Sequence, residues 1–346
     1  MSSPLLGLPG AIGDTFPLHY GDPLGEQRRL TEGAATVDAS SYELITLTGP
    51  DHLVWLDSIS SNVFVGIAHG ETREGLILDP HGHVEHQFLL IDEAEASWLL
   101  VEPGRADALI AWLLSMRFRM QVGIENVSDS WAVIASASAL TSAIHVFADP
   151  WPRVMPGGVA YSVDPHPAEK FTLHWNVVAR ADLTPDLSPH WSGTDALDAL
   201  LVRAARPTMA DVDEKTLPHE LDWLRTAVHL NKGCYRGQET IAKVHNLGHP
   251  PRRAVLLHLD GSDSELPKPG SKVKHDGKVV GRVTRVARHY EWGPIAYAVV
   301  KRSLGPAVDV EVHGSTSAMT ASQELLVAPD AGATRREAIS QYRAGR

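Results

Sequence analysis

The sequence has little sulfur: Cys234 is its single cysteine among 346 residues. One sulfur can form neither an internal disulfide nor a cage of cysteine ligands around a metal ion. Any function of Cys234 must therefore be that of a lone thiol, acting as a nucleophile, a single metal ligand or a redox centre.

Long apolar runs and common catalytic motifs are also missing. The apolar stretches fall far short of the ~20 residues that a membrane-spanning helix needs, and the first residues lack the basic region of a signal peptide. There is no Gly-x-x-x-x-Gly-Lys phosphate loop, no Gly-x-Gly-x-x-Gly, no Gly-x-Ser-x-Gly and no Cys-x-x-Cys. These absences disfavour kinases, dehydrogenases, hydrolases and zinc fingers. We expect a cytoplasmic protein that does not contact membranes.

Positive charge is scarce overall, since 31 Lys and Arg face 42 Asp and Glu, for a net charge of −11. This balance argues against direct binding of nucleic acid. The sign reverses over residues 231–256, which hold one anion, Glu239, and the cations Lys232, Arg236, Lys243, Arg252 and Arg253. Such a basic segment suits an anionic small ligand, although the same charges could form an ordinary solvated face.

Cys234 lies within this basic segment, in the octet Lys-Gly-Cys-Tyr-Arg-Gly-Gln-Glu of residues 232–239. Gly233 and Gly237 predict a loop whose main chain closely approaches another group. A helix is expected over residues 238–245, and its dipole, together with the flanking cations, favours a thiolate. The sequence therefore predicts an accessible, reactive cysteine, with a buried, apolar cysteine as the alternative.

This octet resembles the signature of the YgfZ family, folate-binding proteins related to the T protein (aminomethyltransferase) of the glycine cleavage system. Seven fixed positions match in register, and the resemblance extends through residues 33–40, 47–51 and 218–221. It implies a protein that binds tetrahydrofolate and supports the assembly or repair of iron–sulfur enzymes, including some that modify tRNA. The functional cysteine of the family corresponds to Cys234.

The resemblance also implies a set of ligand-binding residues and partners. The partners would be a reduced folate and iron–sulfur client or assembly proteins, with no metal held by the protein itself. The basic segment leads us to expect tighter binding of polyglutamylated folates. The folate-binding residues would be Lys232, Gly233, Tyr235, Arg236, Gly237, Gln238, Glu239, Arg252, Arg253 and Glu85.

Two departures from T proteins bear on a second hypothesis, a folate-dependent aminomethyl or one-carbon transferase. T proteins carry an acidic pair in the stretch that corresponds to residues 82–87, where this chain keeps Glu85 beside His86. They also end a helix in Glu-Ala-Gly, where this chain has Ala204-Ala205. A pterin ring is typically held by an acid that accepts two hydrogen bonds, so the missing glutamate weighs against transfer. Under this hypothesis Glu85 would be the acid and Cys234 incidental.

Eighteen histidines raise the question of a metal site, most of all at His81, His83 and His86. On a strand, residues 83 and 86 would point to opposite faces. The sequence Asp-Pro-His-Gly of residues 79–82 is typical of a turn between two strands. A hairpin is therefore favoured over a metal site.

The order of predicted elements indicates an α+β protein with a three-part, T-protein-like architecture. Strands and two helices, the second over residues 105–119, predict a ferredoxin-like module. An amphipathic helix over residues 194–205 belongs to a second αβ segment, and Asp276-Gly277 predicts a hairpin in a small antiparallel β-barrel. The expected domains are 1–40 plus 127–250 for folate binding, 41–126 for the ferredoxin-like module and 251–327 for the barrel, with 328–346 a disordered tail.

Overall fold

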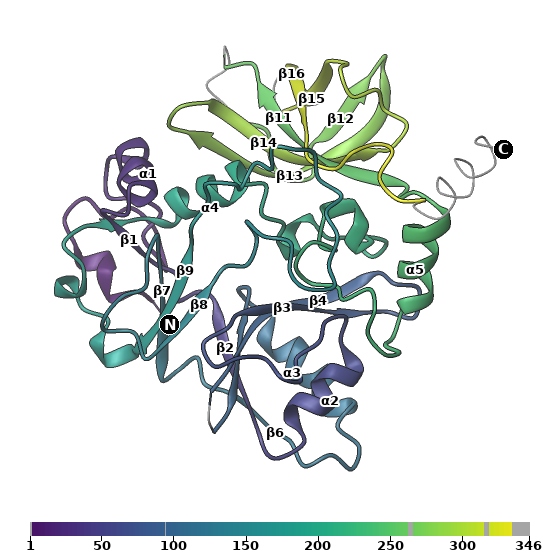
Figure 1. Ribbon diagram of the computed structural model, residues 1–346. Helices are drawn as coiled ribbons and strands as arrows, with labels where there is room; N and C mark the ends of the chain where they lie inside the picture. The colour runs from purple at the N-terminus through teal and green to yellow at the C-terminus, as the bar shows by residue number, and fades with distance from the viewer. Residues whose placement is uncertain (1, 94, 262–265, 315–317, 334–346) are drawn as a thin grey trace.

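A computed structural model describes residues 2–93, 95–261, 266–314 and 318–333 of the chain. It is a mixed α/β structure with two open sheets and one closed antiparallel barrel, so the predicted fold class is confirmed. Figure 1 shows the barrel at one end of the molecule and the sheet carrying helices α2 and α3 at the other. The division of the chain into domains stays a prediction.

The first sheet corresponds to the expected ferredoxin-like module. Its strand order is β3-β4-β5-β2-β6, with every neighbouring pair antiparallel. One face, which includes Phe88 and Leu90, packs with the two helices, and the other, which includes Leu89, faces the main core. The elements are β2 (Glu43–Thr48), α2 (His52–Ile59), β3 (Arg73–Leu78), β4 (Val84–Asp92), β5 (Ser97–Val101), α3 (Ala106–Ser115) and β6 (Gly123–Asn126).

Helix α3 ends earlier than the sequence predicts. The apolar pattern favours a helix to residue 119, but Phe118 adopts a φ of 47°, which a right-handed helix cannot contain. The expected turn at residues 79–82 is confirmed, with Gly82 at a φ of 83° between β3 and β4.

The second sheet has the order β10-β1-β7-β9-β8 and combines an N-terminal strand with strands that follow residue 130. The sequence predicts helix α4 in this part of the chain, whereas α1 and the short strands β1, β8 and β10 were not predicted. Helix α4 ends before the predicted residue 205, because Ala205 has a φ of 52°. The elements are α1 (Pro23–Thr31), β1 (Thr36–Asp38), β7 (Trp131–Ser136), β8 (His145–Ala148), β9 (His174–Ala179), β10 (Trp191–Ser192) and α4 (Thr194–Arg203).

The barrel closes in the order β11-β14-β13-β12-β15-β16. The predicted hairpin joins β12 to β13, where Asp276 and Gly277 both have positive φ, 48° and 72°. Its strands are β11 (Arg252–Leu259), β12 (Lys272–His275), β13 (Lys278–His289), β14 (Gly293–Lys301), β15 (Val310–His313) and β16 (Ala318–Leu325).

Residues 334–346 of the expected disordered tail lie outside the described part of the chain. The preceding residues 328–333 pack against the body, where the Ala328 N–H donates to the carbonyl of Tyr161 at 3.0 Å. The structure therefore orders the beginning of the predicted tail.

One further α-helix and several short helices complete the fold. Helix α5 (Gln238–Leu247) begins at the predicted residue. The 3-10 helices are η1 (Pro4–Gly7), η2 (Arg180–Asp182), η3 (Pro185–Leu187), η4 (Met209–Asp211) and η5 (Pro218–Leu221). In the described ranges, no helix has both the length and the hydropathy needed to cross a bilayer.

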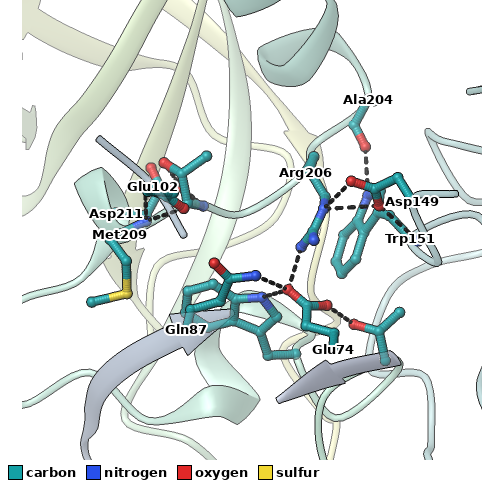
Figure 2. Close-up of polar contacts among 12 residues, drawn as sticks. Glu74, Gln87, Glu102, Asp149, Trp151, Ala204, Arg206, Met209 and Asp211 are labelled. Carbon is teal, nitrogen blue, oxygen red and sulfur yellow. Dashed lines mark hydrogen bonds and ion pairs between the residues drawn. The ribbon is translucent and has the colours of Figure 1, made fainter. Parts of the chain in front are cut away.

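A buried ion network joins the two open sheets. Arg206, just after α4, places Nη1 2.7 Å from Glu74 Oε1 on β3 and Nε 3.1 Å from Asp149 Oδ1, which follows β8. Figure 2 shows the guanidinium between these two carboxylates. Burial opposes the positive charge, but Asp149 and Glu74 outweigh it and raise the pKa of Arg206. The network therefore stays charged inside the protein.

Glu74 also receives neutral donors that complete its hydrogen bonding. Its Oε1 accepts from Gln87 Nε2 at 2.9 Å and from the Trp223 indole at 3.1 Å, and its Oε2 accepts from the Thr226 hydroxyl. A buried carboxylate is tolerated only when its lone pairs are paired in this way.

We predict that Arg206→Ala lowers the free energy of unfolding by about 3–5 kcal/mol, because it leaves two buried carboxylates without their cation. Urea unfolding at neutral pH measures this loss. Arg29→Ala is the matched control, because Arg29 pairs with the largely exposed Asp22 and its removal should cost less than about 1 kcal/mol. A loss at Arg206 as small as the control would contradict a central role for the network.

Candidate functional site

A cavity of about 680 Å³ opens where the three sheets meet. It is lined by one carboxyl at the end of β5, Glu102, and another on α4, Asp198, and by Arg285 on β13 of the barrel. Apolar walls and the N-terminal segment close the sides through Phe16, Leu18, Leu197, Leu201 and Val286. Segments distant in sequence therefore contribute to one open, partly apolar, partly acidic cavity.

The ion network lies directly beside this cavity. A second space, of about 20 Å³, shares Tyr42 and Glu102 with the cavity and is also lined by Gln87, Asp149 and Arg206. Tyr42 packs against Trp175 with ring centroids 4.4 Å apart and the ring planes tilted by 42°. The network thus supports one wall of the cavity.

Glu102 is held in place by the backbone of the η4 turn. Both of its carboxylate oxygens accept from the Met209 N–H at 2.9 Å (Figure 2). Burial raises the pKa of Glu102 to about 7, although the Met209 hydrogen bond and Arg285 act in the opposite direction. A carboxyl with this pKa can donate or accept a proton near neutral pH.

Asp198 is a second carboxyl with a shifted pKa. Solvent reaches its side chain, but the cavity walls surround it, and this desolvation raises the pKa of Asp198 to about 6. Arg285 reduces the shift without cancelling it, because its guanidinium is itself 2.8 Å from Asp211 and donates to the carbonyl of Arg206. The cavity is consequently acidic in character, with its cation already paired.

The structure places the predicted octet outside this cavity. Neither Cys234 nor the expected binding residues Lys232, Gly233, Tyr235, Arg236, Gly237, Gln238, Glu239, Arg252 and Arg253 are among the lining residues. The thiol of Cys234 is exposed, which agrees with the predicted accessible cysteine. The octet and the cavity are therefore two distinct places in the fold.

Most cations of the predicted basic segment are paired within the protein. The Lys232 ammonium, 3% exposed, donates to the backbone carbonyls of Ser60 and Asn62 at 2.9 and 2.6 Å and lies 3.6 Å from an Asp57 oxygen. Burial lowers the pKa of Lys232, and Asp57 opposes that shift. Lys232 therefore anchors the loop to the end of α2.

Two arginines of the segment are paired with acids, and the third, Arg253, is buried without an acidic partner among the described residues. Arg236 pairs with Glu85 at 2.7 Å, and Arg252 pairs with Asp213 and Glu220 at 2.6 and 2.7 Å. Arg253 is buried and donates to the carbonyl of Leu304 and to Gln323. The charge count of this segment consequently overstates the positive charge offered to a ligand.

The second glycine of the octet has a structural role. Gly237 has a φ of 83° at the start of α5, and a Cβ there would lie 2.7 Å from the carbonyl oxygen of Asp79. The octet therefore packs against the β3–β4 turn in a way that only glycine permits.

Glu85 lies in a β-bulge of β4. The pairing with β3 shifts from Ile77 opposite His86 to Leu78 opposite Val84, so Glu85 is an extra residue. Gln87 lines the small space beside the cavity, whereas Glu85 pairs with Arg236. Glu85 does not line the 680 Å³ cavity, whereas Glu102 and Asp198 do.

Sequence reasoning did not single out Glu102 or Asp198, although weak signals were present. Glu102 directly follows the apolar end of β5 and precedes Pro103-Gly104. Asp198 stands beside Leu197 in the leucine pattern of α4. A carboxylate at the end of a buried strand or beside an apolar helix face is a candidate for a site.

Comparisons with known proteins agree with this architecture. Residues 18–138 match the GCVT N-terminal domain, and residues 252–327 match the glycine cleavage T-protein C-terminal barrel domain. A crystal structure of the glycine cleavage system aminomethyltransferase T from Bartonella henselae superposes with a TM-score of 0.71, 18% identity and 94% coverage of both chains. The chain therefore has the fold of the glycine cleavage T proteins.

Several curated relatives are named aminomethyltransferases. An aminomethyltransferase of Moorella thermoacetica is 26% identical and covers 86% of this chain and 88% of its own length. One from Lysinibacillus sphaericus is 25% identical over 78% of both chains, and one from Streptomyces avermitilis is 25% identical over 87% and 88%. The similarity spans 78–88% of the length of these relatives.

We predict that Glu102 makes the protein less stable as the pH rises. Its pKa is raised from 4.5 to about 7 in the folded state. As the pH rises, Glu102 therefore loses its proton at a lower pH in the unfolded chain than in the folded protein, and this favours the unfolded chain. The free energy of unfolding should therefore fall between pH 4.5 and 7 and then level off. Glu102→Gln should remove most of this slope in urea unfolding, whereas Glu214→Gln, at an exposed position, should not. If the free energy of unfolding depends on pH equally in the native protein and both variants, the raised pKa of Glu102 is refuted.

We also predict that Cys234 reacts without unfolding. Because its thiol is exposed on the loop before α5, iodoacetamide should alkylate the native protein at neutral pH at a rate close to that in denaturant. Mass spectrometry measures the rate on the one available thiol. A reaction that required denaturant would show a protected cysteine instead.

Proposed function

We propose that the protein binds a reduced folate in the 680 Å³ cavity and transfers an aminomethyl or one-carbon group, as T-type aminomethyltransferases do. The observation that carries the proposal is the pair Glu102 and Asp198, two carboxyls that line the same cavity and whose pKa values are both raised. Names of relatives at 25–26% identity over most of the chain support the same activity.

The residues of the cavity fit such a ligand. The volume lies within the ~300–1,000 Å³ range of small-molecule sites, and the apolar walls suit an aromatic ring system. A carboxylate can accept two hydrogen bonds from the amino-pyrimidine edge of a pterin, which offsets the absence of glutamate at residues 204–205. Asp198, on the helix that precedes that position, is the residue we assign to this contact.

When bound, tetrahydrofolate supplies the nitrogen that receives the one-carbon unit. Glu102 is about half protonated at pH 7, so it can deliver a proton to a departing amine. The Met209 N–H fixes the carboxyl, and Leu197, Leu201 and Val286 limit access of water. No residue of the octet is needed for this step.

The iron–sulfur accessory function of the YgfZ family is the second candidate, and the exposed Cys234 favours it. The thiol stands on a loop that Lys232 anchors, and it is available to a protein partner rather than to a ligand in the cavity. In this case folate would occupy the same cavity, and the chemistry would lie at Cys234.

We predict that Glu102→Gln and Cys234→Ser separate these functions. With tetrahydrofolate and an aminomethylated lipoyl-carrier protein, the native protein should release ammonia, Glu102→Gln should be slower by about 10²-fold or more, and Cys234→Ser should be unaffected. Ammonia is measured in a coupled assay, with circular dichroism to verify folding.

The same variants should be tested in cells that lack the native gene. If Cys234→Ser accumulates normally but fails to restore a folate-sensitive iron–sulfur enzyme, while Glu102→Gln restores it, the accessory function replaces the transferase. Absence of ammonia release by the native protein would point the same way.

A further inference from the structure

We infer that a polar cleft beside the cavity, centred on Arg180, is the binding site for the anionic glutamate tail of the folate. This inference rests on the proposed folate-binding function and relocates the tail from the octet to another part of the fold. The cleft has a volume of about 440 Å³.

The cleft adjoins the cavity. Thr15, Phe16 and Ser41 line both spaces, so the N-terminal segment forms their common wall. A ligand whose ring system fills the cavity can extend past Phe16 and bring its tail into the cleft. The apolar ring of Phe16 suits the benzoyl part that joins the two ends of a folate.

Arg180 supplies a positive charge that the protein itself does not neutralise. Its Nη2 donates at 2.7 Å to the carbonyls of Ser128 and Trp131, and its Nε donates to the same Ser128 carbonyl at 3.2 Å. Throughout the described residues, no carboxylate lies within ion-pair distance of this guanidinium. The backbone carbonyls thus fix the orientation of Arg180 and leave its charge for a ligand.

This is the difference from the other arginines near the cavity. Arg206 and Arg285 are paired with buried carboxylates, and Arg236 and Arg252 of the predicted basic segment are paired as well. Arg180 is the cation lining the cavity or the cleft that pairs with no described acid.

Neutral donors in the cleft complete the case for a carboxylate ligand. Asn126 uses its side-chain oxygen to accept from the N–H and hydroxyl of Ser128, which leaves its amide nitrogen as a donor. Ser40 and Ser41 also line the cleft. Hydroxyl, amide and guanidinium donors together match the carboxylates and amides of a glutamate chain.

Two acids also line the cleft, and they determine whether a substitution there should strengthen or weaken binding of the anionic tail. Glu43 accepts from the backbone N–H groups of Arg105 and Ala106 at the start of α3, so its charge is compensated there. Asp129 is exposed, and it should repel an anionic tail. Removing Asp129 should consequently strengthen tail binding, whereas removing Arg180 should weaken it.

The experiment is calorimetric titration with tetrahydrofolate monoglutamate and triglutamate at low ionic strength. The native protein should bind the triglutamate roughly two- to fivefold more tightly, as expected for partly exposed ion pairs, and salt should reduce this preference. Arg180→Ala should abolish the preference for the triglutamate. The affinity for the monoglutamate should change by no more than about twofold, because the exposed α-carboxylate of that ligand contributes little to binding. Asp129→Asn should enlarge the preference.

Two control variants separate charge from structure. Arg180→Lys should keep much of the preference if the charge matters, even where Arg180→Ala disturbs the loop through the lost carbonyl contacts. Arg119→Ala, which removes an exposed arginine outside the cleft, should behave as the native protein. Equal affinity for both ligands in the native protein, or an unchanged preference in Arg180→Ala, would overturn the inference, whereas failure of both folates to bind would instead overturn the proposed function.

Discussion

The structure depends on one buried ion network, in which Arg206 bridges Glu74 and Asp149. The three residues come from separate parts of the chain, and their contacts bring the ferredoxin-like sheet against the second sheet. Taking three charges out of water is costly, so the arrangement is stable only because neutral donors such as Trp223 complete it. The position of α4, and with it the cavity wall, follows from where Arg206 is held.

The chemistry of the cavity follows from that arrangement. Helix α4 brings Asp198 to one wall, the end of β5 brings Glu102 to another, and the η4 turn after Arg206 supplies the N–H that fixes Glu102. The surrounding protein partly desolvates each carboxyl, and this raises the pKa of both. The raised pKa values are a property of the assembled sheets rather than of either residue alone.

The fold keeps this cavity apart from the octet that is most distinctive in the sequence. Lys232 and Gly237 attach the octet to the end of α2 and to the β3–β4 turn, and the loop between them exposes Cys234. A ligand site in the cavity and a thiol on the surface can therefore serve different partners. This separation explains why substitutions at Glu102 and Cys234 are able to distinguish the two candidate functions.

The sequence by itself determined the α+β class, the barrel with its Asp276-Gly277 hairpin, the helix that starts at residue 238 and the exposure of Cys234, because these follow from local turn chemistry and periodicity. It did not determine the site. The five cations of residues 231–256 look alike in the sequence, and only the tertiary structure decided that Arg236 and Arg252 are neutralised by acids elsewhere in the chain. Glu85 likewise pairs with Arg236 and does not line the cavity, which Glu102 and Asp198 reach from separate elements. Charge pairing and desolvation depend on which distant groups come into contact, and a linear sequence does not contain that information.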